Sequence, residues 1–468
     1  MNMDFFILMK HELSLMLIIF ILLFLKIRSA EMNVDSLLNT INVLLLINFA
    51  LCFVMNKTGE LFSGMYHTNE LLALEKNILN FGTLIISLQA YNWLRNHKHL
   101  LEFYMLLLSS VIGMFYMLSA GNFLMFYLGL ELSTIPLAAL ANFDLEKNKS
   151  SEAAVKMILS SAFASAIMLF GISMIYGTTG TLSFDTMVNY LDGSNLQLLA
   201  FIFIFGGFAF KLSIVPFHLW TADVYEGAPV SITAFLSVIS KAAMSFALIT
   251  VIHNVFREFE SMWYNMLFVS IVITITVGNI FAIRQDNIKR FLAFSSIAQV
   301  GYILLGLSSG TNLGASSAIY FLVIYVFSNL GAFGVIALVS AQTGKENISD
   351  FRSFYTNNKM LSWVMAISLF SLAGVPPTAG FFGKMFLVTS GASKGNYLLI
   401  TIASLNMVVS LYYYLKIVKT MLVDKSEAPI EKINRCNHAY LAIAVCMIGV
   451  IVTGFYSGLL DYIINLFG

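Results

Sequence analysis

Long apolar runs, interrupted by short polar connections, dominate the pattern of hydrophobic and polar positions along the chain. A membrane-spanning helix needs about 20 mostly apolar residues. On that measure the sequence predicts fourteen transmembrane helices, numbered 1 to 14 below. They are expected near residues 13–27, 37–55, 77–94, 101–119, 122–142, 153–176, 196–222, 229–254, 263–283, 290–309, 313–341, 361–391, 396–422 and 439–467.

The connections between these segments leave little room for a soluble domain, since the longest are 55–76 and 177–195. A membrane β-barrel requires short segments of alternating hydrophobicity, and the continuous apolar run 196–210 contradicts that pattern. The first segment is expected to be a retained helix and not a signal peptide, because Lys26 and Arg28 follow it without a small-residue cleavage site. The fold class is therefore an all-α polytopic membrane protein.

Composition agrees with this fold class and excludes several functions. Hydrophobic residues make up 59% of the 468 residues and charged residues only 11%, against about 25% charged residues in soluble domains. Lipid is therefore the expected surrounding. A net charge of +1 gives no basic surface for nucleic acid.

The sequence gives no sign of a cofactor on this chain. Its three cysteines, Cys52, Cys436 and Cys446, have no CxxC spacing, so they are expected to be packing residues and not ligands of zinc or an iron–sulfur cluster. Neither GxGxxG nor GxxxxGK[ST] occurs, so no nucleotide or flavin motif is present.

The distribution of positive charge predicts the orientation in the membrane. Of the 26 lysines and arginines, 17 fall in connections on one side and five on the other, namely Lys10, Lys57, Lys76, Arg257 and Lys394. The side richer in positive charge is normally cytoplasmic. Both termini are then expected to face outward.

The remaining four lysines lie inside apolar segments, and one glutamate joins them. These residues are Lys156, Lys211, Lys241, Lys384 and Glu131. A charge at the membrane centre costs at least about 2.5–3.5 kcal/mol, so five such groups indicate an ion or proton path. Burial destabilises the charged form of either residue type, and a lysine, unlike an arginine, can release its proton. This favours proton movement.

Structural explanations remain open for each of these charges. Lys156 lies near the start of its segment and could reach the interface. The other four could form purely structural ion pairs. His218, seven residues after Lys211, fits a relay group and a packed, hydrogen-bonded histidine equally well.

Two of the expected helices are interrupted by proline and glycine. Helix 7 contains Pro216 in AFKLSIVPFHLW, and helix 12 contains Pro376 and Pro377 in SLAGVPPTAGFFG. Such breaks are tolerated where the backbone lines a hydrated cavity or the protein interior. Broken helices in matching positions of two halves indicate a transport site. Their separation predicts two inverted five-helix repeats, helices 4–8 and 9–13, unless the prolines are ordinary kinks.

Several runs of sequence resemble the antiporter-like membrane subunits of respiratory complex I, the NADH–quinone oxidoreductase. The strongest is FKLSIVPFHLWTADVYEGAPVSITAFLSVISKAA at 210–243, whose VPFHLWTADVYEGAP is most similar to the bacterial subunit N branch of that family. The supporting runs are LGLELSTIPLAAL at 128–140, SEAAVKMILSSAFASAIMLFG at 151–171, RFLAFSSIAQVGY at 290–302 and SLAGVPPTAGFFGKMF at 371–386. The resemblance covers residues 100–425 well and the three leading helices poorly.

The resemblance implies a domain organisation and a role for each candidate residue. Three leading helices would occupy 1–99, the two repeats 100–255 and 256–425, and the last helix 426–468. By position in the matching motifs, Glu131 and Lys211 would form the glutamate–lysine pair of the first repeat, with Lys156 near it. The other implied relay positions are Lys241 on the central polar axis, His218, and Lys384 at the end of the second half.

One position departs from the family pattern. Many relatives have histidine in SSIAHxGY where this chain has Gln299. Glutamine does not titrate but can hold water, so the relay there would need ordered water or Tyr302.

By resemblance, the chain is a proton-translocating subunit of the complex, without redox chemistry of its own. NADH, FMN, iron–sulfur clusters and quinone would be bound by partner subunits. The expected partners are other membrane subunits, especially the neighbouring antiporter-like subunit and small membrane subunits, in a bacterial inner membrane. Two alternatives stay open. Multi-subunit sodium/proton antiporters share Glu131, Lys211 and Lys241, and a structural scaffold would tolerate apolar replacements of the deep charges.

Overall fold

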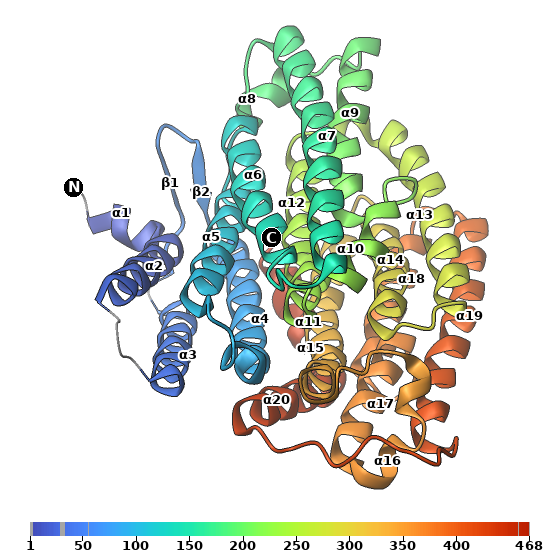
Figure 1. Ribbon diagram of the computed structural model, residues 1–468. Helices are drawn as coiled ribbons and strands as arrows, with labels where there is room; N and C mark the ends of the chain where they lie inside the picture. The colour runs from blue at the N-terminus through green and yellow to red at the C-terminus, as the bar shows by residue number, and fades with distance from the viewer. Residues whose placement is uncertain (1–2, 29–32, 55, 457, 468) are drawn as a thin grey trace.

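The computed structural model describes residues 3–28, 33–54, 56–456 and 458–467, and in this part the chain is almost entirely helical (Figure 1). The N-terminal elements are α1 (Met3–Leu8), α2 (Lys10–Arg28), α3 (Val34–Leu51), β1 (Gly59–Leu61), β2 (Tyr66–Thr68) and α4 (Glu70–Leu94). The central helices are α5 (Leu100–Leu118), α6 (Phe123–Ala141), α7 (Asn148–Thr179), α8 (Phe184–Met187), α9 (Asn195–Leu212), α10 (Leu219–Gly227), α11 (Val230–Phe235) and α12 (Lys241–Asn254). The C-terminal helices are α13 (Glu260–Ile283), α14 (Ile288–Leu307), α15 (Asn312–Thr343), α16 (Phe354–Asn357), α17 (Lys359–Ala373), α18 (Ala379–Ala392), α19 (Tyr397–Leu422), α20 (Asn437–Phe455) and α21 (Gly458–Asn465).

Short helical turns complete the secondary structure. Three are 3₁₀ turns, η1 (Val188–Tyr190), η3 (Arg257–Phe259) and η4 (Ile348–Phe351), and η2 (Leu236–Ser240) is a π-helical turn. The π turn joins α11 to α12, immediately before Lys241. π turns are rare and occur often at functional sites.

Within the described residues, twelve helices are long and apolar enough to cross a membrane. The other two expected segments correspond to α2, which carries charges at both ends, and to the α17–α18 pair, whose members are short. The multi-pass helical fold is therefore confirmed, and the count of fourteen spans stays a prediction.

The structure differs from the sequence-based expectations at three places. The connection 55–76 contains an antiparallel hairpin, in which β1 pairs with β2, and α4 begins inside it at Glu70. Lys76, expected in that connection, is instead fully buried in α4. The expected single helix 439–467 is wrong, because α20 ends at Phe455 and α21 is separate.

Two of these expected segments include positions without a description. The segment 37–55 ends in the structure at Leu51, and its position 55 lies outside the described residues, as does position 457 of the last segment.

Both expected helix breaks are present, and the chain builds them in the same way. α9 ends before Ser213, which has a left-handed φ of 63°, and α17 ends before Gly374, with φ of 86°. In each case the next two backbone N–H groups bond back to the last turn, as in a Schellman cap: Ile214 N to Ala209 O (2.8 Å) and Val375 N to Phe370 O (3.0 Å). These bonds satisfy part of each broken end from within the chain, as a helix break at membrane depth requires.

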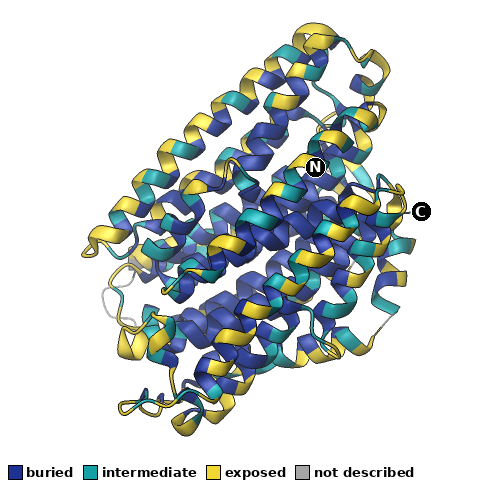
Figure 2. Ribbon diagram, turned by 90° about the vertical axis from the view of Figure 1, so that its right-hand side faces the viewer, coloured by how far each residue is buried: buried dark blue, intermediate teal, exposed yellow. Residues whose placement is uncertain are grey.

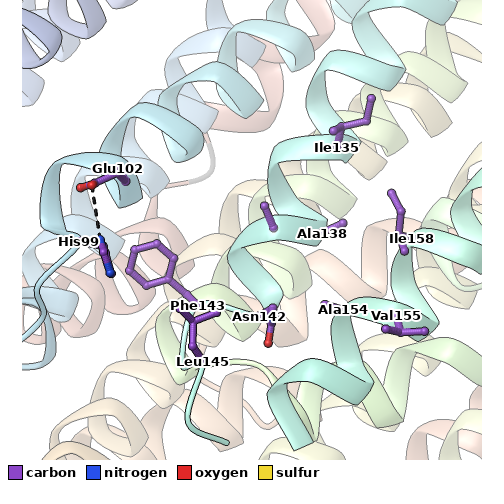
Figure 3. Close-up of a pocket in the computed structure, with 11 residues that line it drawn as sticks. His99, Glu102, Ile135, Ala138, Asn142, Phe143, Leu145, Ala154, Val155 and Ile158 are labelled. Carbon is purple, nitrogen blue, oxygen red and sulfur yellow. Dashed lines mark hydrogen bonds and ion pairs between the residues drawn. The ribbon is translucent and has the colours of Figure 1, made fainter. Parts of the chain in front are cut away.

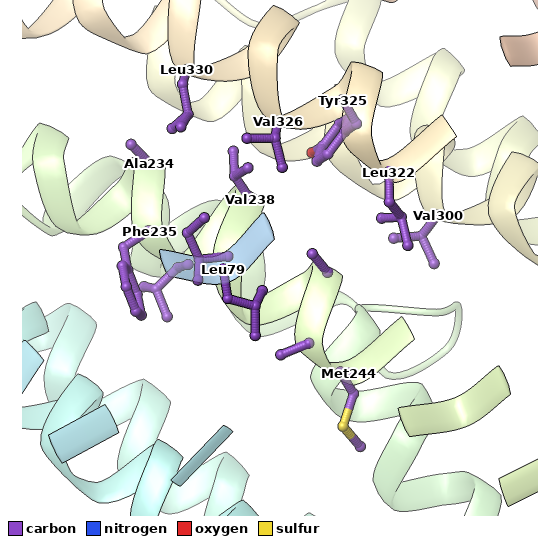
Figure 4. Packing of buried hydrophobic residues seen from close by; sticks show 14 of the residues in the cluster. Leu79, Ala234, Phe235, Val238, Met244, Val300, Leu322, Tyr325, Val326 and Leu330 are labelled. Carbon is purple, nitrogen blue, oxygen red and sulfur yellow. The ribbon is translucent and has the colours of Figure 1, made fainter. Parts of the chain in front are cut away.

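The core lies where the two halves of the chain meet. α15 packs against α4, α14, α17, α18 and α20, so it is the central helix of the molecule. Figure 4 shows Leu79 of α4, Phe235 of α11 and Val238 of η2 near Tyr325 and Leu330 of α15. Buried residues fill the centre and exposed residues follow the outer helix faces and the ends (Figure 2).

The exposed faces of the outer helices are apolar, as a lipid-facing surface requires. On α7 the side chains of Phe163 and Leu159 are 70% and 66% exposed, and on α19 Val408 is 66% exposed. Large apolar side chains exposed in such rows mark a membrane or partner surface.

Candidate functional site

Glu131 and Lys211 come from neighbouring helices but do not form a direct ion pair. Lys211 lies in the last turn of α9, and its amine donates a hydrogen bond to Thr134 Oγ1 of α6. Thr134 is three residues after Glu131, on the same side of α6. The two charges interact through space, while the buried Oε1 of Glu131 has no hydrogen-bond partner in the described part of the chain. The amine of Lys211 is therefore bonded to the Thr134 hydroxyl and not to the Glu131 carboxylate.

Glu131 lies at the edge of an apolar outer face of α6. It is itself half-buried, and Leu124, Leu128 and Ile135 on this helix are at least half exposed. Glu131 therefore lies between this apolar outer face and the interior of the molecule.

Lys156 belongs to an ion-pair network and not to the Glu131 and Lys211 site. Its amine lies 2.6 Å from Glu152 and 2.6 Å from Asp223 of α10, and its side chain is 40% exposed. Asp223 also pairs with Arg290 of α14, at 2.7 Å. Glu226 extends the network by pairing with Arg290 and with Lys149, at 3.1 and 2.8 Å. These contacts tie α7 and α14 to α10, the second half of the broken helix.

His218 lies inside the first break, between α9 and α10. The side chain is 9% exposed, and its buried Nδ1 has no hydrogen-bond partner among the described residues. Trp220 closes the break by donating from Nε1 to the carbonyl of Phe210, at 3.1 Å. Buried polar atoms normally have a hydrogen-bond partner, so this ring nitrogen of His218 is an exception at the helix break.

Lys241 is the first residue of α12, directly after the π turn, and is 1% exposed. Its amine donates to Ser296 Oγ of α14 (2.8 Å) and lies 5.7 Å from the ring centre of Tyr225. Within the described residues no carboxylate pairs with this lysine. A buried amine without a counter-charge is held only by a hydroxyl and an aromatic ring, which makes the charged form costly.

Lys384 is fully buried in α18 and occupies the second break. Its amine donates to the carbonyls of Leu372 (2.7 Å) and Ala373 (3.3 Å), the last residues of α17, and lies 4.9 Å from the ring centre of Tyr302. The free carbonyls at a helix C-terminus carry partial negative charge. The break therefore supplies the oxygen ligands that this lysine needs.

Gln299 connects the same break to the neighbouring helices. Its Nε2 donates to Leu372 O (2.9 Å), which Lys384 also uses, and to Tyr414 OH of α19 (3.1 Å). Its buried Oε1 has no partner among the described residues. Gln299 and Lys384 therefore share one carbonyl, and an acceptor remains free for water.

The tyrosine that joins Gln299 is Tyr414 and not Tyr302. Tyr302 donates to the backbone of Ala403 at 3.3 Å, whereas the hydroxyl of Tyr414 bonds both Gln299 and Ser295 Oγ. Ser295 and Ser296 are adjacent on α14. Buried polar groups therefore form two bonded sets, Lys241 with Ser296, and Ser295 with Tyr414, Gln299 and Lys384, and no hydrogen bond in the described residues joins the two serines. We call the two sets together the polar line.

Sequence reasoning missed Thr134, the hydroxyl partner of Lys211, and the neutral members of the polar line. Thr134, Ser295, Ser296 and Tyr414 are ordinary in composition, and only their positions on charged or broken segments could have drawn attention. The serines stand in RFLAFSSIAQVGY, four and three residues before Gln299.

A hollow of about 630 Å³ lies elsewhere, on the surface formed by α6, α7 and the start of α5. Figure 3 shows Ile135, Ala138 and Ile158 along it, with His99 bonded to Glu102 at one side. Its lining is mostly apolar and contains none of the deep charges. It is not part of the polar line.

Nothing in the described part of the chain gathers three metal-ligating side chains, and Cys52, Cys436 and Cys446 are buried and unpaired. The polar line consists of amines, hydroxyls, an amide and carbonyls.

Comparison with known proteins decides the family. Residues 120–410 match the model described as NADH:quinone oxidoreductase/Mrp antiporter, TM. NADH-quinone oxidoreductase subunit N of Azobacteroides pseudotrichonymphae genomovar. CFP2 is 50% identical over 410 residues, which cover 86% of this chain and 85% of that protein. The chain belongs to the subunit N family.

Solved structures share the fold of this chain. A chain of respiratory complex I from Thermus thermophilus with bound aureothin has a TM-score of 0.81 at 26% identity, covering 96% of this chain and 97% of that one. A chain of the Mrp complex from Dietzia sp. DQ12-45-1b has a TM-score of 0.87 at 18% identity, with coverage of 97% and 96%. At that identity the second similarity shows a common fold alone.

Proposed function

We propose that this subunit N chain translocates protons as part of the membrane arm of an NADH–quinone oxidoreductase. The observation that carries the proposal is the buried polar line between Lys241 and Lys384, inside helices that are otherwise apolar. A purely structural protein would gain nothing from two buried lysines without counter-ions.

The first step takes place at Lys211. Its hydroxyl partner, Thr134, keeps the amine near the Glu131 carboxylate without direct contact. A small shift of α6 against α9 would exchange the hydroxyl for the carboxylate, and an opposite charge within about 4–6 Å favours the ammonium form. The perturbation that causes this shift comes from quinone reduction in other subunits.

The second step moves the proton along the buried line. Lys241 passes it to the hydroxyls of α14, and Tyr414 and Gln299 orient the path to Lys384. Gln299 cannot titrate, so we propose that ordered water at its free Oε1 carries the proton across this position. His218 lies in the break next to Lys211, and Lys156 lies in the ion-pair network. Both assist proton transfer at Lys211.

A change in the proton affinity of one lysine can supply the free energy needed to move a proton against the membrane potential. Moving one charge outward against 100 mV costs about 2.3 kcal/mol. A hundredfold change in the proton affinity of one lysine corresponds to about 2.7 kcal/mol.

The wider setting that we propose is the one that the family resemblance implies. The chain itself carries out no redox chemistry, and NADH, FMN, iron–sulfur clusters and quinone belong to partner subunits. Its neighbours are another antiporter-like subunit and small membrane subunits, in a bacterial inner membrane, with both termini outside. Fourteen spans, with helices 4–8 and 9–13 as inverted repeats, complete the proposed architecture, and the equivalent caps of α9 and α17 support it.

Two experiments test this function. Purification through a tag on this chain should bring down iron–sulfur subunits, whereas antiporter subunits in their place would favour the sodium/proton antiporter alternative. In proteoliposomes, the Lys241→Ala complex should assemble and lose most proton translocation. Pumping at the wild-type ratio of protons to NADH would refute the proposal.

A further inference from the structure

A second set of buried ionisable groups lies among the N-terminal helices, away from the polar line. Lys76 of α4 forms an ion pair with Glu12 of α2, with Nζ 2.6 Å from Oε1, and both side chains are 0% exposed. Tyr66 of β2 bonds the other oxygen of Glu12 at 3.0 Å and accepts from Lys76 at 3.1 Å. This pair is fully satisfied, and it ties α2, the hairpin and α4 together.

Glu75, the residue before Lys76, is not part of that pair. Successive residues of a helix point about 100° apart, so Glu75 faces away from Glu12. It is 1% exposed, and its Oε2 has no hydrogen-bond partner among the described residues. Glu12 already balances Lys76, and no salt bridge joins Glu75 to a cation in the described part of the chain.

Glu75 is instead among the residues that line a cavity of about 320 Å³ beside the β1–β2 hairpin. The ionisable groups that line it with Glu75 are His67 of the hairpin, Asp185 of α8 and His253 of α12. The Asp185 side chain is 79% exposed and lies 3.9 Å from His67, so the cavity opens to the surface. His253 Nε2 is a further buried atom without a described partner.

The cavity also touches the helix that carries the central lysine. Ile249 and Thr250 of α12 line it, and Ile249 is eight residues after Lys241, about 12 Å along the helix axis. α12 therefore runs from the buried polar line to the wall of this cavity.

A buried carboxyl with a free oxygen is costly when charged, unless water or a proton compensates it. The cavity has the volume and the polar lining to admit several water molecules. A carboxyl that lines a wet cavity, shielded from bulk solvent but connected to it, can take a proton from hydronium, leaving water, and return it in the reverse step.

We infer that Glu75 is a proton-exchange group that connects this subunit to the aqueous phase on the hairpin face. The Glu12–Lys76 pair holds α4 so that Glu75 faces the cavity. The inference rests on the proposed function, since it assigns to that proton path an opening on this face. By the expected orientation this is the outer face, so the group serves proton release.

The test compares Glu75→Gln with Glu70→Gln in the complete complex reconstituted into proteoliposomes. Glutamine keeps the size of the side chain and removes its proton exchange. Glu70 is the exposed first residue of the same helix, so it controls for the loss of one acidic group from α4. We expect Glu75→Gln to slow proton translocation at least about tenfold while Glu70→Gln leaves it unchanged. A wild-type ratio of protons to NADH in Glu75→Gln overturns the inference.

A second measurement does not depend on the activity of the variant. A carbodiimide reacts with protonated carboxyls, and mass spectrometry locates the product. We expect the carbodiimide to modify Glu75 in the wild-type complex. In the Thr250→Trp complex, where the larger side chain closes the cavity, we expect Glu75 to stay unmodified. An unmodified Glu75 in the wild-type complex, under conditions that modify exposed Glu70, contradicts a water-connected carboxyl.

The two failures can be told apart by including Lys241→Ala. If Lys241→Ala loses pumping and Glu75→Gln does not, only the exchange site is refuted. If Lys241→Ala pumps normally, the proposed function itself fails.

Discussion

Gln299 provides the sharpest prediction, because its amide does not titrate and it joins Tyr414 to the break that holds Lys384. Replacing it by leucine removes the donors to Leu372 O and to Tyr414 OH, at 2.9 and 3.1 Å. It also removes the free Oε1 that we expect to hold water. Lys384 keeps its own two carbonyl ligands, so the substitution breaks the link and spares the lysine.

The magnitude follows from the hydrogen bonds that are lost. Each buried bond contributes a net of about 0.5–1.5 kcal/mol, so two contribute about 2 kcal/mol. We assume that each proton passes only when the hydrogen-bonded link is intact. Because 1.4 kcal/mol corresponds to a factor of ten, a loss of about 2 kcal/mol lowers the population of the intact link roughly 30-fold. We therefore expect proton translocation by Gln299→Leu to slow by a factor of about 10–30.

The assay follows NADH oxidation and acidification of the lumen in the same proteoliposomes, after confirming assembly of the complex. Gln299→His should pump well, because an imidazole N–H replaces one donor and the ring can titrate. Gln342→Leu is the matched control, since that glutamine also bridges two segments, through the backbone of Asn434, but at the exposed surface. Normal pumping by Gln299→Leu in an intact complex would refute the reasoning.

Three further predictions concern the charged residues. Lys211→Arg should assemble but fail to pump protons, because a guanidinium does not release its proton. Glu131→Ala should also assemble and fail to pump. Proton pumping by either variant in the vesicle assay would argue against a proton switch formed by Glu131 and Lys211. Lys241→Ala should reduce pumping more than Lys156→Ala, since Lys241 is 1% exposed whereas the Lys156 side chain is 40% exposed and ion-paired; the reverse order in one assay would contradict this. Asp223→Asn should destabilise the complex by about 1 kcal/mol, because its two ion pairs are partly exposed; an unchanged thermal midpoint would show that the network contributes nothing.

The sequence predicted the spanning helices and both helix breaks well, for a physical reason. Apolar length and interior proline are local properties, and the membrane leaves the backbone few alternatives. The hairpin and the early start of α4 were missed, because polar residues such as Glu70 and Glu75 made that segment read as a connection.

The hydrogen-bond partners of the side chains were harder to predict from the sequence than the burial of those side chains. The burial of Lys241 and Lys384 is confirmed, but the bond from Lys211 to Thr134 and the one from Gln299 to Tyr414 depend on how separate helices face one another. The burial of Lys76 was missed because its partner, Glu12, is 64 residues away. An ion pair of that separation leaves no signal in a hydropathy pattern.

The central claim, that buried lysines carry the pumped protons, is tested most directly by the ratio of protons translocated to NADH oxidised in the Lys211→Ala complex. The measurement needs complete assembly, with quinone reduction recorded in the same vesicles. The account predicts that the ratio falls well below the wild-type value. A wild-type ratio in the fully assembled variant would contradict it.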